Sequence, residues 1–492
     1  MALILLSLPI ALCVTFLLSR WQDDSLASVP GPKISKWTGI VLKYHWLIGN
    51  RMKYVHALHH RYGPIVRVSP DEVDVTDIAA VKNIHRIGTS FIKSYTFYRT
   101  LTLPDIENLF NTSDVQFHSA RRRLFSSPAS DVELHKSEAL IDARVKLAIE
   151  KMRAEMQTEA GAVDIFQWWI FMTTDIIGEL CFGDSFHMLE YGKNNQYARD
   201  LTAVASLESV KVAFPRLVGL AGAIPFPVPY IQQAAHAGAR FGQYAVESVQ
   251  RYKQLLSSSA SSAEPMKQTL FTRLFQIHSN KDDENSLPDK AIIDEAITFI
   301  VAGSDTTANT LTYLVWTLCQ PQNTTLRTQL LSELASLPSS FNDSHLSPLP
   351  YLSYVINETL RLYSGVPSAL PRVSNQNTIL AGHHIPAGTT VTTQAYSLHR
   401  DPSIYKDPEI FNPSRWENPT REMKDAFMPF GGGARTCLGI HLAKIELRLA
   451  TARFFRAFPN PKVDESMKVE DMDQLAWFLL APKGKKCLIR GE

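Results

Sequence analysis

The chain has 492 residues, 45% of them apolar, and its charges nearly cancel, with 50 Lys and Arg against 48 Asp and Glu. Because single hydrophobic cores stop growing at roughly 250–300 residues, a chain of this length is expected to fold into two lobes or two domains. The chain has no long run of one charge, which argues against nucleic-acid binding, and its five widely spaced cysteines include no CxxC pair, which argues against a disulfide framework or a zinc site.

The first segment, Met1 to Ser19, is nearly all apolar and has no charged side chain. Its length is close to the roughly 20 residues that a helix needs to cross a bilayer. Arg20, Lys33 and Lys36 follow it, and positive charge after a span places the remainder of the chain in the cytosol. A cleaved signal peptide is the alternative, because Ser25 to Ala27 resembles a cleavage site. The long apolar run without a preceding Lys or Arg favours an uncleaved transmembrane anchor.

A proline-rich segment follows the predicted anchor. Val29 to Pro32 has the sequence VPGP, which is typical of a stiff turn. Residues 20–36 are therefore interpreted as a hinge between the anchor at residues 1–19 and a globular domain at residues 37–492.

The remaining sequence predicts a mainly α fold with minor β structure. A short hairpin is expected at Ile65–Val68 and Glu72–Thr76, where β-branched residues flank a Pro-Asp turn. Asp289 to Cys319 has no internal proline and predicts one long helix. Further helices are expected at Pro350–Tyr363, which starts on a proline in a tolerated position, and at Leu438–Phe458.

A glycine-rich string, FGGGARTCLG, runs from Phe430 to Gly439 and leads into the last of these helices. Glycines let the backbone approach a flat ligand closely. Cys437 stands where the loop enters the helix, and helix N-terminal N–H groups stabilise a thiolate there. A thiolate can be the axial ligand of haem iron, and Arg435 can pair with an anionic group such as a haem carboxylate. Taken alone, Cys437 would be interpreted as a small buried hydrophobe, but the surrounding string favours a ligand.

The string AGSDTT, from Ala302 to Thr307, lies in the middle of the predicted long helix. Its glycine costs about 1 kcal/mol relative to alanine, and a flat cofactor lying against the helix would compensate. The Thr306 hydroxyl can bond to the carbonyl of Ala302, one turn earlier, and so open the helix for water or dioxygen. Asp305 can feed protons from solvent, so the acid and the alcohol form a candidate proton relay. The alternative is a small-residue helix contact with a polar edge.

These strings resemble those of the cytochrome P-450 superfamily. Phe430 to Gly439 matches the pattern F-x-x-G-x-R-x-C-x-G at every defined position, and Ala302 to Thr307 is similar to A/G-G-x-D/E-T-T/S. Glu358 and Arg361 match the E-x-x-R motif. The resemblance covers essentially the whole chain, in order. It implies a cytochrome P-450 fold preceded by one N-terminal transmembrane helix, with the iron of haem b held by Cys437.

The resemblance also implies roles for further residues. Phe430 would pack beside the sulfur and Gly439 would lie close to the cofactor. Asp305 and Thr306 would deliver protons. Arg415 would complete a folding network with the E-x-x-R pair. Besides Arg435, the residues expected to hold the haem carboxylates are His118, Arg122, Arg372 and His399, although His118 replaces the tryptophan of the family's W-x-x-x-R pattern.

The function implied is a monooxygenase that inserts one oxygen atom of O2 into a small apolar organic substrate. Electrons would come from NADPH through NADPH–cytochrome P-450 reductase. Asp175 to Gly183 looks like fungal members of secondary metabolism, which suggests a secondary-metabolite intermediate as substrate. The implied location is the endoplasmic reticulum membrane, single-pass, with a cytosolic catalytic domain. The alternatives are a haem-thiolate isomerase or dehydratase and a non-catalytic membrane haem-binding protein, and the presence of Asp305 and Thr306 argues against both.

Two surfaces are predicted to contact partners. Arg121 to Arg123, with Lys444 and Arg448, would steer an acidic flavin domain of the reductase. The apolar, proline-rich segment Ala223 to Tyr230 would be a second contact with membrane lipid, because aromatic rings favour the interface. An ordinary buried loop is the alternative for that segment.

Overall fold

A computed structural model describes residues 24–102, 106–158, 161–192, 200, 229–259, 268–279 and 288–491. The predicted anchor at residues 1–19 and residues 223–228 of the predicted lipid contact lie outside these ranges. Within the described ranges, no helix is both long enough and apolar enough to span a bilayer.

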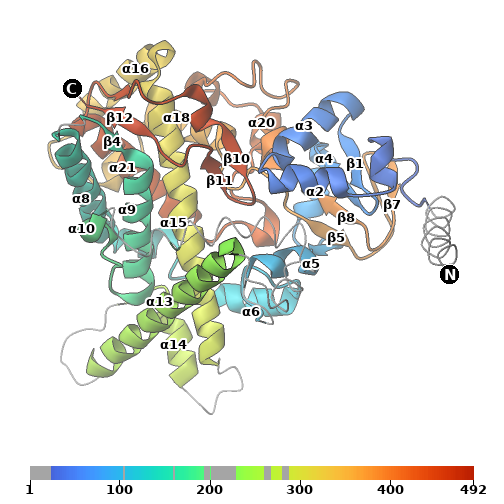
Figure 1. Cartoon of the computed structure of the whole chain (residues 1–492), viewed down its shortest axis with the longest axis horizontal. Helices are drawn as coiled ribbons and strands as arrows, with labels where there is room; N and C mark the ends of the chain where they lie inside the picture. Colours follow the sequence, from blue (N-terminus) through green and yellow to red (C-terminus); the bar gives the residue numbers. More distant parts are fainter. Residues whose placement is uncertain are drawn as a thin grey trace.

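Helices make up most of the described chain, and the predicted class of mainly α with minor β is confirmed (Figure 1). The longer ones are α2 (Ile40–Leu47), α3 (Arg51–Tyr62), α4 (Ile78–His85), α6 (Val115–Ser126), α8 (Glu138–Met156), α9 (Ile165–Phe182), α13 (Pro229–Ser259), α14 (Thr272–Ser279), α15 (Asp289–Cys319), α16 (Thr324–Ala335), α18 (Pro350–Leu362) and α21 (Ile440–Ala457). Short ones are α5 (Tyr95–Tyr98), α7 (Asp131–His135), α10 (Met188–Tyr191), α17 (Asp343–Leu346), α19 (Ala395–Leu398) and α20 (Arg421–Ala426).

A five-stranded sheet joins distant parts of the chain in the order β1-β2-β8-β5-β3. Its strands are β1 (Ile65–Ser69), β2 (Glu72–Val75), β3 (Phe91–Lys93), β5 (Arg372–Ser374) and β8 (Thr390–Thr392). The predicted hairpin is confirmed as the antiparallel pair β1–β2, while β2 pairs with β8 in parallel. Smaller sheets are formed by β4 (Val163–Asp164), β12 (Leu488–Arg490) and β9 (Lys462–Val463), by β6 (Thr378–Leu380) and β7 (His383–Ile385), and by β10 (Gln474–Ala476) and β11 (Leu480–Pro482).

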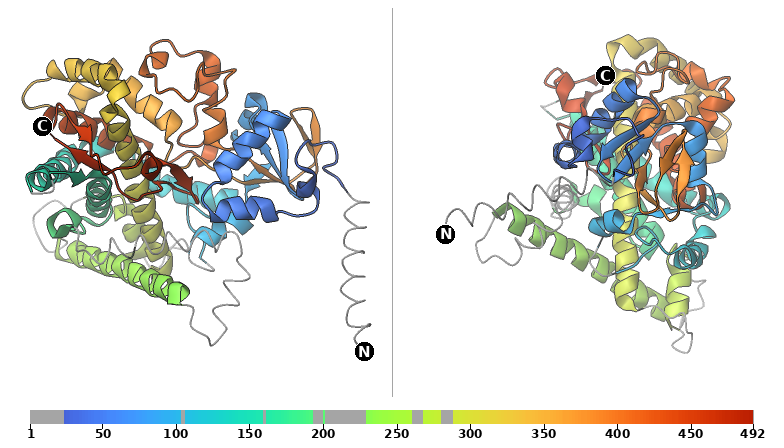
Figure 2. Two further views of the ribbon diagram at one scale, coloured as in Figure 1. Left: turned by 45° about the horizontal axis from the view of Figure 1, so that its top comes forward. Right: turned by 90° about the vertical axis from the view of Figure 1, so that its right-hand side faces the viewer.

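The described buried hydrophobic residues form one large cluster among the helices and a smaller cluster around the sheet, and two minor clusters lie beside them. Figure 2 shows the corresponding arrangement, with the sheet at one end of the molecule and the long helices at the other. Leu26 and Val29 belong to the smaller cluster, and Pro30 O accepts a hydrogen bond of 2.7 Å from Arg67 N of β1. Asp24 also pairs with Arg67. The part of the predicted hinge from residue 24 onward is therefore packed onto the sheet.

Helix α15 has the predicted bounds and packs along α9. Gly303 is needed at this contact, because a Cβ there would lie 2.7 Å from Cγ1 of Ile177 in α9. The expectation that a flat cofactor explains this glycine is therefore wrong. The absence of a side chain at residue 303 instead lets two buried helices approach closely, and it leaves the Ala302–Thr306 side of α15 to the site.

Candidate active site

Cys437 lies at the end of the glycine-rich loop, three residues before α21 begins. Its backbone N donates a hydrogen bond of 2.9 Å to Phe430 O, and this bond closes the loop. Gly433 has a φ of +63°, and a Cβ there would lie 1.6 Å from the carbonyl oxygen of His85 at the end of α4. This glycine is therefore required by the close approach of α4.

The Cys437 thiol is desolvated and yet accessible. Burial, the largest influence, raises the pKa of the thiol, while a hydrogen bond from the Gly439 backbone and the charge of Arg122 act in the opposite direction. The side chain is nevertheless exposed, so it faces a space inside the fold. The expected stabilisation of a thiolate by N–H groups at the start of the helix is present in the hydrogen bond from Gly439, but the desolvation of the sulfur outweighs it. A metal ion bound at the sulfur would favour the thiolate further, in the same direction as Arg122.

Helix α6 brings Arg122 and His118 to the loop. Nη1 of Arg122 donates a hydrogen bond of 2.8 Å to Thr436 O, beside Cys437. Burial first and then the charges of Arg435 and Arg122 lower the pKa of His118 to about 3. The imidazole of His118 is therefore neutral and able to donate one hydrogen bond.

Lys93 and Arg372 lie directly opposite each other in the β3–β5 pair. Like charges in directly opposed positions destabilise a sheet unless an anion lies between them. Burial first and then the charges of Arg372 and Arg435 hold the pKa of Lys93 well below its usual range. Its Nζ donates a hydrogen bond to Phe110 O and lies 3.8 Å from the ring centre of Tyr98. No motif in the sequence marks Lys93, because its position opposite Arg372 depends on strand register.

Arg435 completes this set of cations. Burial first and then the charge of Arg372 lower the pKa of Arg435 to about 10. Its Nη1 is buried and has no hydrogen-bond partner among the described residues. We call the set of side chains that influence one another here the basic group; it consists of Lys93, His118, Arg122, Arg372 and Arg435. Among the described residues no carboxylate pairs with these side chains, although Lys93, Arg122 and Arg372 donate to backbone oxygens. A set of basic side chains without an acidic partner is suited to binding carboxylates.

His399 does not join the basic group. Its Nδ1 lies 2.9 Å from Arg361 O, and its Nε2 accepts a hydrogen bond of 3.0 Å from Met428 N. Both ring nitrogens are thus used by the backbone, and burial lowers the pKa of the imidazole to about 3. The interpretation of His399 as a cofactor-binding residue conflicts with this placement. The residue is a structural neighbour of Arg361.

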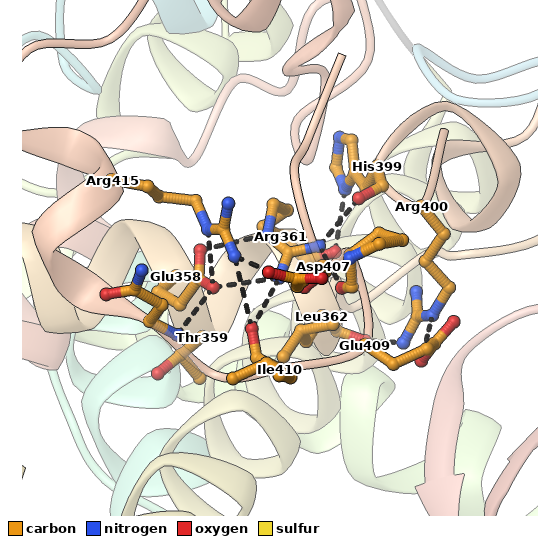
Figure 3. A network of polar contacts seen from close by, with 12 residues as sticks. Glu358, Thr359, Arg361, Leu362, His399, Arg400, Asp407, Glu409, Ile410 and Arg415 are labelled. Carbon is orange, nitrogen blue, oxygen red and sulfur yellow. Dashed lines mark hydrogen bonds and ion pairs between the residues drawn. The ribbon is translucent and has the colours of Figure 1, made fainter. Parts of the chain in front are cut away.

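The E-x-x-R pair forms the predicted network with Arg415 (Figure 3). Oε1 of Glu358 accepts hydrogen bonds of 2.8 Å from Arg361 Nη2 and 2.9 Å from Arg415 Nε. Oε2 accepts from Arg361 Nε and from Trp416 Nε1, at 2.9 and 3.0 Å. Nη1 of Arg361 donates to His399 O at 2.7 Å. This set, called the E-x-x-R network, matches buried charges with partners inside the protein.

The predicted bond within α15 is present. Thr306 Oγ1 donates a hydrogen bond of 2.9 Å to Ala302 O, and both residues are accessible on this side of the helix. Burial raises the pKa of Asp305 to about 7. A carboxyl group with this pKa both holds and releases a proton near neutral pH, which is the property that a proton relay requires.

Glu446 is a second buried acid, and it was not among the residues predicted for the site. It lies in α21 and is 1% exposed. Burial raises its pKa to about 8, while a hydrogen bond with Thr307 of α15 acts in the opposite direction. The protonated side chain of Glu446 therefore links the helix that follows Cys437 to the helix that carries Thr306. Its position, nine residues after Cys437, offered no sequence signal by itself.

The cations predicted to face a reductase are only partly at the surface. Arg121 is 5% exposed, and its Nε lies 3.5 Å from Oε1 of Glu295 in α15. Arg448 makes a bidentate ion pair with Asp343, at 2.6 and 2.5 Å. The inclusion of Arg121 in the docking surface is therefore wrong, whereas Arg123 and Lys444 are exposed.

The residues at this site fit a haem group. Cys437 offers a sulfur ligand from the glycine-rich loop, and the basic group offers buried donors for the propionate carboxylates. Ala302 and Thr306 present an accessible helix face, and α21 packs against α15.

Comparisons with known proteins agree with this fit. The family model described as Cytochrome P450 matches residues 29–489. Cytochrome P450 monooxygenase tazI of Aspergillus terreus is 47% identical over 474 residues, covering 96% of this chain and 94% of the relative. Cytochrome P450 monooxygenase orf2 of Aspergillus niger is 39% identical over 491 residues, covering 98% and 97%. A methylphloroacetophenone oxidase of Cladonia uncialis is 28% identical over 391 residues, covering 77% and 83%.

The family match and the identity to the two monooxygenases make the protein an oxidoreductase of the monooxygenase class with a haem-iron cofactor. The chain belongs to the cytochrome P450 family.

Proposed function

We propose that the protein inserts one oxygen atom of O2 into a small apolar organic substrate, an intermediate of secondary metabolism. Electrons come from NADPH through NADPH–cytochrome P450 reductase. The observation that carries this proposal is the pair formed by Asp305, whose pKa burial raises to about 7, and Thr306, which bonds to Ala302 O. Oxygen insertion consumes protons, and an acid–alcohol pair on the accessible face of α15 is suited to supply them.

The cofactor is haem b in this proposal, and the bound haem iron supplies the binding and reduction of dioxygen. Cys437 would hold the iron as a thiolate, because coordination would favour loss of the thiol proton against the burial that raises its pKa. Phe430 and Gly439 shape the loop around the sulfur. The haem carboxylates would be bound by four of the predicted residues, His118, Arg122, Arg372 and Arg435. Lys93 would also contribute, because it lies opposite Arg372.

Asp305 and Thr306 act in sequence on protons. Asp305 takes up a proton from solvent, because its carboxyl group is half protonated near pH 7. The Thr306 hydroxyl, held by Ala302 O, keeps its oxygen lone pairs available to receive a hydrogen bond on the accessible side. The two residues thereby hold a proton beside the reacting oxygen and limit its supply to one path.

An aromatic substrate is supported by two observations. The name methylphloroacetophenone oxidase identifies an aromatic ketone as the compound on which that relative acts. In this protein Phe97, Tyr98, Phe110 and Phe478 form a cluster of rings, with centroids of Phe110 and Phe478 5.8 Å apart. Aromatic rings pack favourably against such clusters.

Membrane attachment belongs to the same proposal. Residues 1–19 form the transmembrane anchor, residues 20–36 lead to the body, and residues 37–492 are the catalytic domain on the cytosolic side of the endoplasmic reticulum. The support is the uncharged apolar sequence of Met1 to Ser19. Arg123 and Lys444 are the exposed cations that would meet the acidic flavin domain of the reductase.

Thr306→Ala tests the proposed function. With reductase and a converted substrate, the variant should still oxidise NADPH and consume O2, but product per NADPH should fall at least about tenfold and hydrogen peroxide should rise, since a positioned acid–base group contributes roughly 10²–10⁴ in rate. Thr312→Ala is the matched control, because Thr312 makes the same kind of bond, 2.8 Å to Ala308 O, from a buried position. Unchanged coupling in Thr306→Ala, or turnover without O2, would contradict the proposal.

A further inference from the structure

The loop from Ile106 to Thr112 is fastened to α15 by Asn108, which is fully buried. Nδ2 of Asn108 donates hydrogen bonds of 2.5 Å to Oδ2 of Asp294 and 3.0 Å to Oγ1 of Thr298. Asp294 is 1% exposed. A buried charge that receives such a bond is costly to leave unpaired, so this contact holds the loop strongly.

The other end of the same amide shapes the loop. Oδ1 of Asn108 accepts hydrogen bonds from the backbone N of Phe110 and of Asn111, at 2.9 and 2.8 Å. The backbone N of Leu109 donates to Oε1 of Glu295 at 3.0 Å. One side chain thus folds the loop with its oxygen and binds the helix with its nitrogen, and Glu295 adds a second anchor point one residue further along.

Arg121 of α6 approaches this contact from the other side. Its Nε lies 3.5 Å from Oε1 of Glu295, which is fully buried. Among the described residues, Nη1 of Arg121 and Oε2 of Glu295 have no hydrogen-bond partner. The same oxygen of Glu295 accepts the hydrogen bond from Leu109 N, so Arg121 supports the carboxyl group that holds the loop.

The fastening point lies on the reactive face of α15. Glu295, which accepts the hydrogen bond from Leu109 N, lies seven residues before Ala302 and eleven before Thr306. At 3.6 residues per turn these three residues lie within roughly 40° of one another around the helix axis and so share one side, next to Asp294. Asp294 is about 12 Å along the helix axis from Ala302, at roughly 1.5 Å per residue. The loop therefore covers the stretch of α15 next to the accessible residues of the site.

Phe110 connects the loop to the aromatic cluster. Its ring centroid lies 5.4 Å from that of Tyr98 and 5.8 Å from that of Phe478, and its carbonyl accepts the hydrogen bond from Lys93. A change in the Asn108 contact therefore moves Phe110 and the ring cluster relative to Ala302 and Thr306.

We propose that Asn108, Asp294 and Glu295 form a latch that fixes the loop from Ile106 to Thr112 on α15 and thereby determines which substrates reach Ala302 and Thr306. These are positioning residues that act through Phe110. The latch deepens the proposed function, on which it rests for the identity of the reaction.

A reciprocal exchange of donor and acceptor tests the latch. Asn108→Asp keeps the oxygen that accepts from Phe110 and Asn111 but replaces the donor facing Asp294 with an acceptor. Asp294→Asn in the same chain restores the hydrogen bond in the reverse direction, with the donor on residue 294 and the acceptor on residue 108. Amide hydrogen exchange of residues 108–112 and binding of two iron-ligating probes, imidazole and the bulky azole clotrimazole, are measured on the haem-loaded protein.

In Asn108→Asp, exchange at Leu109 and Phe110 should accelerate by roughly tenfold, the effect of losing one buried hydrogen bond, and clotrimazole affinity should change by a similar factor. Imidazole affinity should stay within about twofold, because it is too small to contact the loop. The double variant should return both properties toward wild type. Unchanged exchange and clotrimazole binding in Asn108→Asp, or a double variant no closer to wild type, would overturn the latch. Neither measurement needs turnover. The latch can therefore be supported or refuted whatever the outcome of the Thr306→Ala test of the proposed function.

Discussion

The E-x-x-R network and the basic group both consist of buried or half-buried ionisable side chains, but the groups that accept their hydrogen bonds differ. Glu358 receives hydrogen bonds from Arg361, Arg415 and Trp416, so the network is complete within the protein. In the basic group, Lys93 stands opposite Arg372, and Arg435 keeps a donor without a partner among the described residues. The E-x-x-R network is thus satisfied by the fold itself, whereas the basic group leaves a buried donor of Arg435 available to a ligand.

Breaking the complete network should have the largest effect. Glu358→Gln removes the charge that compensates Arg361 and Arg415, and both guanidinium groups are largely buried. Leaving buried charges unpaired should lower the free energy of unfolding by roughly 3–5 kcal/mol. Chemical denaturation followed by circular dichroism measures this change. Stability within about 1 kcal/mol of wild type would show that the network is not structural.

Breaking the incomplete group should weaken cofactor binding with little loss of stability. Arg372→Gln removes a cation that lies opposite Lys93 in the sheet, so repulsion between the two side chains falls and the fold is not weakened. The same change removes a contact to the haem carboxylates. Haem affinity should fall by roughly tenfold to a hundredfold, as expected for one charge-assisted bond of about 1.5–3 kcal/mol. Haem transfer to an excess of apomyoglobin measures the dissociation rate. Arg86→Gln, a change of the same kind at the end of α4, serves as the control.

Glu446 differs from both groups, because this buried acid has no cationic partner in the described part of the chain and burial favours its protonated, uncharged form. Its pKa rises from 4.5 to about 8, so between these values the folded protein binds a proton that the unfolded chain does not. The free energy of unfolding must therefore fall as pH rises through this window. Glu446→Gln should remove this contribution, and its stability relative to wild type should grow by up to about 1.4 kcal/mol per pH unit. Denaturation at a series of pH values measures this difference. The same dependence of the free energy of unfolding on pH in both proteins would contradict the prediction.

The exposed cations should give the smallest effect. Charge reversal at Arg123 and Lys444 should slow reduction by the reductase severalfold at low ionic strength, and the difference should shrink in salt. Stopped-flow reduction measures the rate, and clotrimazole binding should not change. Charge reversal at Lys146, an exposed lysine of α8, provides the control. Reduction at the wild-type rate in low and high salt would exclude this surface.

The sequence was sufficient for features that depend on local spacing. The bounds of α15, the bond from Thr306 to Ala302 O and the place of Cys437 before a helix all follow from residues close together in the chain. The contact between Glu358 and Arg415 followed from the family resemblance.

Features that depend on tertiary contacts could not be read from the sequence. Lys93 meets Arg372 only because strands about 280 residues apart pair in one register. His399 cannot bind the cofactor, because its two ring nitrogens are hydrogen-bonded to Arg361 O and Met428 N. Arg121 becomes buried through the packing of α6 near Glu295. Each of these outcomes depends on burial, which a single sequence indicates only on average.

The most direct test of the contrast between the two groups uses a cofactor without carboxylates. Apoprotein is reconstituted with haem or with haem dimethyl ester, and the two dissociation rates are compared in wild type, in Arg372→Gln and in Glu358→Gln. If the basic group binds the carboxylates, wild type should hold haem far more tightly than the ester. Arg372→Gln should lose roughly tenfold or more of that preference. Glu358→Gln should keep the preference in the fraction of the protein that folds. Equal preference for haem over the ester in wild type and Arg372→Gln would contradict the assignment.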